Sequence, residues 1–194
     1  MLAFCHTATL RRLIVATPSD IGARAPDFDL VGTDGRRHRR DQLARPNGLL
    51  VMFICNHCPY VKAVIDKIIR DATALEAQGV GSVAISSNDP TDYPEDSFDN
   101  MKSVAARLNF TFPYLWDETQ DVAKAYGAVC TPDFFGYNGK LELQYRGRLD
   151  DSGRSSKPDA PRELYEAMVQ VARTGKGPAK QTDSIGCSIK WRNG

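Results

Sequence analysis

Residues 49–65 read L-L-V-M-F-I-C-N-H-C-P-Y-V-K-A-V-I, and this stretch decides how the chain is built. Its first six residues are apolar without alternation, which is typical of a central strand covered on both faces. From Val61 onward apolar residues recur with helical spacing, while charged residues take the opposite side. Pro59 falls where a helix would begin, at a position that needs no backbone N–H. The stretch therefore predicts a buried strand followed by an amphipathic helix, with Cys55 and Cys58 at their junction.

The rest of the chain continues this alternation of short apolar runs and amphipathic segments. Strand, helix, strand, helix implies parallel strands joined by crossovers. We expect an N-terminal hairpin around a turn at 33–35, strands at 82–86 and 112–116, a hairpin of 133–137 and 141–145 around an Asn138-Gly139 turn, and helices at 98–108, 117–126 and 161–173.

Composition indicates one soluble globular domain, because 194 residues with 42% hydrophobic content suffice for a core. A formal charge of +1 asks for neither nucleic acid nor an anionic membrane. The basic run at 36–40 and the acidic run at 89–99 read as solvated faces. No apolar run approaches the roughly 18 residues of a membrane helix. We divide the chain into an N-terminal extension (1–20), expected to be poorly ordered, a domain (21–175) and a tail (176–194) that packs on it.

The cysteines indicate a reducing compartment. There are five, at positions 5, 55, 58, 130 and 187, which is too few and too scattered for a disulfide-rich scaffold. An odd count also leaves at least one thiol over. We therefore expect a cytoplasmic protein.

The pair Cys55 and Cys58 could bind a metal, anchor haem, form a structural staple or exchange electrons. A structural zinc site needs four ligands, commonly two pairs, and only one C-x-x-C is present. Covalent haem needs histidine directly after the second cysteine, where Pro59 stands. A staple closing so small a loop removes little entropy from the unfolded chain. A redox-active disulfide without metal or other cofactor remains the favoured interpretation, and metal a minor one.

The junction also suggests roles for the two sulfurs. If the helix begins near residues 56–59, Cys55 lies at its N-terminus, where N–H groups and the helix dipole favour a thiolate. We then expect Cys55 to be the nucleophile that attacks a substrate disulfide, and Cys58, one turn into the helix, to be the thiol that resolves the mixed disulfide. His57 would add to this bias if protonated; alternatively it is an exposed residue without a catalytic task.

The strand, the C-N-H-C motif and the helix together resemble the thioredoxin superfamily, from about Ala25 to Arg173. The resemblance implies a three-layer α/β/α sandwich with a central mixed sheet, extended by the N-terminal hairpin and the C-terminal tail. G-A-V-C-T-P at 127–132 resembles the loop of that fold whose proline is cis and packs against the C-x-x-C. By this resemblance Pro132 is cis and Thr131 offers backbone groups to a disulfide substrate. Asn56 is the third expected substrate-binding residue.

Further motifs are similar to the AhpC/TSA and redoxin branch, which is peroxiredoxin-like. They are A-P-D-F-D-L with T-D-G, F-P-Y-L-W-D-E-T before A-K-A-Y-G, Y-R-G-R-L-D-D, and the terminal G-C-S-I-K-W. A true peroxiredoxin carries P-x-x-x-T-x-x-C. Counting back from Cys55, those places hold Gly48 and Met52. Arg146 or Arg148 could approach the site or remain on an exposed hairpin.

These features predict a thiol–disulfide oxidoreductase that cycles a Cys55–Cys58 dithiol. The first alternative is a peroxiredoxin-like thiol peroxidase that reduces hydroperoxides through Cys55. The second alternative is a non-catalytic binding module with the thioredoxin fold. The implied partners are a disulfide-containing protein or a small-molecule thiol or peroxide as substrate, and a dithiol or NADPH-linked reductase as electron donor. Cys130 is either a buried apolar residue or an additional redox thiol. Cys187 is expected to help dock the tail. The oligomeric state does not follow from the sequence.

Overall fold

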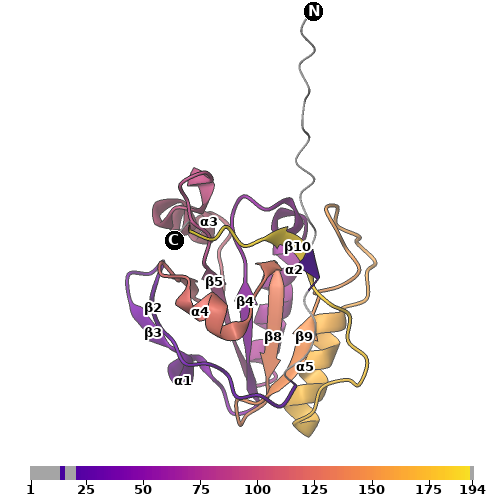
Figure 1. The fold of residues 1–194 in the computed structure, drawn as a ribbon. Helices are drawn as coiled ribbons and strands as arrows, with labels where there is room; N and C mark the ends of the chain where they lie inside the picture. Colours follow the sequence, from indigo (N-terminus) through magenta and orange to yellow (C-terminus); the bar gives the residue numbers. More distant parts are fainter. Residues whose placement is uncertain (1–13, 16–20, 193–194) are drawn as a thin grey trace, which may run out of the picture.

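The computed structural model describes residues 14–15 and 21–192. A seven-stranded mixed sheet forms the centre of the molecule (Figure 1). In spatial order its strands are β3 (Arg37–Arg39), β2 (Asp29–Gly32), β6 (Tyr114–Trp116), β5 (Val80–Ser86), β4 (Gly48–Phe53), β8 (Asp133–Tyr137) and β9 (Leu143–Gly147). Strands β4, β5 and β6 run parallel, while β8 joins β4 antiparallel. The predicted N-terminal hairpin is confirmed as β2 and β3.

Strand β4, which takes in 49–53 of the apolar run at 49–54, shows why that run has no alternation. All six residues are buried. Leu50 and Met52 pack into the core on one face of the sheet, whereas Leu49 and Phe53 pack into the core on the other. A strand between two cores needs apolar side chains on both sides. The predicted central strand is therefore confirmed.

Helices cover both faces of this sheet. The first core lies under α2 (Pro59–Glu76), α3 (Phe98–Arg107) and α5 (Glu163–Thr174), and the second under α1 (Arg40–Leu43) and α4 (Asp121–Tyr126). A short 3₁₀ turn, η1 (Pro94–Asp96), precedes α3. The three-layer, thioredoxin-like α/β/α arrangement is thus confirmed. None of the helices in the described part of the chain is long and apolar enough to cross a membrane.

A second, three-stranded sheet lies beside the main one. It consists of β1 (Ile14–Val15), β10 (Ile185–Ser188) and β7 (Cys130–Thr131), with β10 in the middle. The sequence predicted no strand in the tail, because four residues including glycine and serine carry no periodic signal. Residues 1–13 and 16–20 of the predicted N-terminal extension, Cys5 among them, lie outside the described residues.

The connection between β8 and β9 corrects one prediction. The hairpin forms, but Leu141, and neither Asn138 nor Gly139, has the positive φ, of 60°. The Asn138 side-chain oxygen accepts N–H bonds from Lys140 and Glu142, both at 3.0 Å, and so shapes a longer loop. Gly139 serves close packing instead, since a Cβ there would lie 2.2 Å from Pro46 O.

Candidate active site

The two cysteines lie where β4 ends and α2 begins, as predicted, but their relation to the helix differs. Helix α2 starts at Pro59 and Cys58 is its N-cap residue. Cys58 is therefore not one turn into the helix, and Cys55 lies a further three residues away from its start. Both are buried, with 1% of Cys55 and none of Cys58 exposed.

The loop at 130–132 meets both sulfurs. The Thr131–Pro132 peptide bond is cis, which confirms the prediction made for Pro132. Thr131 Oγ1 lies 3.2 Å from Cys55 Sγ, and the Cys58 thiol donates to Thr131 O at 3.1 Å. One residue of the cis-proline loop thus contacts both members of the pair.

Asp96 organises the C-x-x-C loop, and no pattern in the sequence indicated this role. One carboxylate oxygen accepts the backbone N–H groups of Asn56 at 2.7 Å and His57 at 3.0 Å. The other accepts from the His57 ring at 2.5 Å and from Asn88 Nδ2 at 2.8 Å. Asp96 is fully buried, so the interpretation of the whole acidic run as a solvated face is wrong at this position. An acidic run shows no period that would mark one member as buried.

His57 is held rather than free. Its side chain is 6% exposed and its ring stacks on Tyr93 with centroids 4.2 Å apart, so it is not an exposed helix-start residue. Nδ1 bonds to Asp96 and lies 3.7 Å from Cys55 Sγ. Nε2 is buried and has no hydrogen-bond partner among the described residues. The ring is therefore oriented by Asp96 beside the first sulfur.

The electrostatics reverse the expected order of acidity. Burial above all, then the Cys58 sulfur and the Asp96 charge, raise the pKa of Cys55 well above its ordinary value. The pKa of Cys58 is lowered, because as a thiolate it accepts hydrogen bonds from the thiols of Cys187 and Cys55 and from the Val61 backbone N–H. Val61 is the third residue of α2, so this last influence on the Cys58 sulfur comes from the first turn of the helix. The helix terminus favours the thiolate of Cys58, not that of Cys55.

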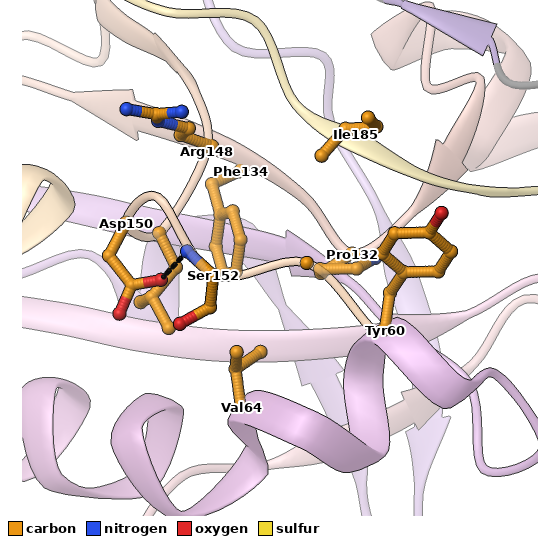
Figure 2. A pocket seen from close by; sticks show the side chains of 10 residues that line it. Tyr60, Val64, Pro132, Phe134, Arg148, Asp150, Ser152 and Ile185 are labelled. Atoms are coloured by element: carbon orange, nitrogen blue, oxygen red, sulfur yellow. Dashed lines mark hydrogen bonds between the residues drawn. The ribbon is translucent and has the colours of Figure 1, made fainter. Parts of the chain in front are cut away.

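The C-terminal strand β10 closes the site. Cys187 lies opposite Thr131 in an antiparallel pairing. The Thr131 backbone, which the thioredoxin resemblance predicts to bind a disulfide substrate, therefore pairs with the protein's own strand β10. Figure 2 shows the pocket beside Pro132, which Tyr60, Val64 and Ile185 of β10 help to line and which has a volume of about 20 Å³. Such a volume holds about one water molecule and no peptide.

The remaining candidates lie as follows. Both side-chain polar atoms of Asn56 bond within the protein, to Glu95 O and the Tyr114 hydroxyl, which gives Asn56 a structural part instead of an open substrate contact. The Cys130 thiol is buried and faces Pro132 O at 3.6 Å, and burial followed by the Asp133 charge raises its pKa. Arg148 forms an ion pair with Glu163.

Arg146 is buried beside the same loop. Its guanidinium donates to Gly127 O at 2.6 Å, lies 3.8 Å from Asp133 and covers the ring of Phe135. These contacts anchor the segment that leads to Thr131. The prediction of an exposed arginine on the hairpin is therefore wrong for Arg146.

Cys55, His57 and Asp96 could in principle hold a metal ion, since a ligand atom of each lies within 4.8 Å of the others. Three such ligands suffice for an open zinc site. The Asp96 carboxylate, however, is already surrounded by four N–H donors. This arrangement suits holding the loop better than binding a cation.

Comparison with known proteins identifies the family to which the chain belongs. The sequence profile of the AhpC/TSA family matches residues 21–151. The thiol-disulfide oxidoreductase ResA of Geobacillus thermodenitrificans is 28% identical over 131 residues, which cover 66% of this chain and 71% of that protein. A crystal structure of an uncharacterized conserved protein from Geobacillus kaustophilus is similar with 44% identity and a TM-score of 0.89, over 94% of this chain and 98% of that one. A hypothetical protein from Sinorhizobium meliloti follows with 36% identity and a TM-score of 0.88, over 93% and 99%. The chain belongs to the AhpC/TSA family, within the thioredoxin superfamily.

Proposed function

We propose that this protein is a thiol–disulfide oxidoreductase whose Cys55 and Cys58 alternate between dithiol and disulfide. The observation that carries the proposal is the shared contact of both sulfurs with Thr131, next to a cis proline. A pair of thiols joined by a hydrogen bond at a helix start is suited to exchange chemistry. The relative named as a thiol-disulfide oxidoreductase supports the same activity.

In the reducing direction, Cys55 attacks one sulfur of a substrate disulfide and forms a mixed disulfide. We assign this attack to Cys55 because the Cys58 sulfur is already engaged by the Cys187 thiol and backbone N–H of β10. The Cys55 proton passes to Cys58, whose thiolate accepts the Cys55 hydrogen bond, and from there to the leaving substrate thiolate. The Cys58 thiolate then attacks Cys55 Sγ and expels the second substrate sulfur. Two electrons reach the substrate, and a dithiol protein or NADPH-linked reductase restores the pair.

The test is turnover of a protein disulfide by the reduced protein, followed in the wild type and in single Cys→Ser variants. Cys55→Ser is expected to abolish turnover, and Cys58→Ser to stall as a mixed disulfide on Cys55 that intact-mass measurement detects. Cys130→Ser is the matched control, because its thiol faces Pro132 O and not the pair. Wild-type turnover by Cys55→Ser would refute the proposal. Rapid oxidation of Cys55 to sulfenic acid by hydrogen peroxide, without disulfide turnover, would indicate a peroxidase instead.

A further inference from the structure

Strand β10 is fitted closely against the cis-proline loop. Cys187 lies opposite Thr131 and Ser188 opposite Cys130, and the Ile189 N–H continues the contact to Val129 O at 3.2 Å. Gly186 makes this approach possible, since a Cβ there would lie 2.1 Å from Thr131 O. Figure 1 shows β10 crossing the end of the molecule at which α2 begins. Strand β10 is therefore part of the wall of the candidate active site.

This fit brings a third sulfur to the pair. The Cys187 thiol and the Cys187 backbone N–H both hydrogen-bond to Cys58 Sγ. Cys187 is 8% exposed and packs in the same apolar cluster as Cys55 and Cys58. Cys58 is thus the common hydrogen-bond partner of two thiols, Cys55 and Cys187, and it can form a disulfide with only one of them at a time.

We propose that Cys187 is a third redox thiol, which takes the disulfide over from Cys55 by forming a Cys58–Cys187 bond. This inference rests on the proposed function, since the Cys55–Cys58 disulfide is its starting point. The pairing of β10 with the cis-proline loop, which brings Cys187 to the sulfur that Cys55 also contacts, carries it.

The exchange balances without an external reagent. The Cys187 thiolate attacks Cys58 Sγ, the Cys55–Cys58 bond breaks, and Cys55 leaves as a thiolate. The proton lost by Cys187 ends on Cys55, so that one disulfide and one thiol are present before and after. No net oxidation occurs, because the disulfide only moves within the protein.

The product differs from the starting disulfide in what it leaves accessible. A Cys58–Cys187 bond ties β10 to the start of α2 and so keeps Thr131 covered. Cys55 is then a thiol beside His57, whose ring Asp96 orients. This thiol can exchange with a small-molecule disulfide, which, unlike a protein strand, does not need the Thr131 backbone.

Trypsin separates the thiols well enough to test this. Cleavage after lysine and arginine, except before proline, leaves Cys55 and Cys58 together on 41–62, Cys130 on 125–140 and Cys187 on 181–190. The full chain is oxidised in a glutathione redox buffer, quenched with acid, alkylated with N-ethylmaleimide and digested without reduction. Mass spectrometry then identifies linked peptides in the wild type and in Cys55→Ser, Cys187→Ser and Cys130→Ser.

We expect the linked pair 41–62 and 181–190 in the wild type, in Cys130→Ser and, more abundantly, in Cys55→Ser. Cys187→Ser is expected to hold only the internal disulfide of 41–62. If 181–190 is alkylated in every oxidised sample while the internal disulfide forms, this inference is wrong and the proposed function stands. If neither disulfide forms, both are wrong.

Discussion

Replacing Asp96 by asparagine tests whether one buried carboxylate holds the active-site loop. Asparagine keeps an oxygen that can accept the two backbone N–H groups, but its amide nitrogen meets two donors, His57 Nδ1 and Asn88 Nδ2. Asn88 has no easy flip, because its oxygen accepts the Lys190 N–H at 2.9 Å. Two hydrogen bonds to a charged acceptor are lost, each worth about 1.5–3 kcal/mol. We therefore expect Asp96→Asn to lower the free energy of unfolding by about 3 kcal/mol or more.

Urea unfolding at pH 7 measures this loss, with Asp92→Asn as the control because Asp92 is exposed in the same acidic run. Burial acts to raise the pKa of Asp96, but the bonds from His57 and Asn88 outweigh it and hold the pKa below 3.8. A depressed pKa stabilises the fold above the unfolded pKa, and this stabilisation disappears as the pH falls through the folded value. The deficit of Asp96→Asn should shrink accordingly at low pH. A variant within about 0.5 kcal/mol of wild type at pH 7 would refute the assignment, since that is the range of ordinary surface substitutions.

Three further predictions concern strand β10, a buried ion pair and a buried acid. In Gly186→Val, even the Cβ of the new side chain would lie 2.1 Å from Thr131 O, so β10 should detach. Alkylation of the dithiol by iodoacetamide should then accelerate at least about tenfold. Lys67→Met leaves the buried Asp150 without its partner at 2.6 Å, and we expect a loss of about 3–5 kcal/mol in urea unfolding. Burial raises the pKa of Asp133 to about 6, so stability present below the unfolded pKa should decline by about 3 kcal/mol as the pH rises through 6, and Asp133→Asn should flatten that profile.

Matched variants separate these effects from general damage. Gly153→Val adds the same side chain where no heavy atom lies within 4 Å of the new Cβ, and alkylation should stay at the wild-type rate. Lys62→Met removes an exposed lysine from the same helix as Lys67 and should leave the unfolding midpoint unchanged. Equal effects of either control and its test variant would contradict the corresponding prediction, as would an Asp133→Asn profile that declines like the wild type.

The sequence predicted the elements whose side chains repeat. Strand β4 and helix α2 were evident, because burial on two faces and burial on one stripe leave different spacings of apolar residues. The cis bond before Pro132 followed from a family resemblance and not from spacing. Periodicity reports which face of an element is buried, and so it predicts the layers of the fold well.

The same reasoning failed wherever a single tertiary contact decides the outcome. Asp96 stands among Asp92, Glu95 and Asp99, which are exposed, and only the fold brings it to the loop at 56–57. Strand β10 exists because Gly186 fits against Thr131, a contact between residues far apart in the chain. The relative acidity of the sulfurs depended on whether α2 begins before or after Cys58, and boundaries are the least predictable property of a helix.

Strand β10 also turns substrate access into an equilibrium between two forms of the protein. If a protein substrate binds only when β10 is released, its apparent dissociation constant is the intrinsic one divided by the released fraction. A released fraction of about 1% would weaken binding about a hundredfold without any change at the sulfurs. Substitutions along the tail, at Ile185 or Ser184 for example, would then tune which substrates are reduced at a given concentration, while the chemistry at Cys55 stayed the same.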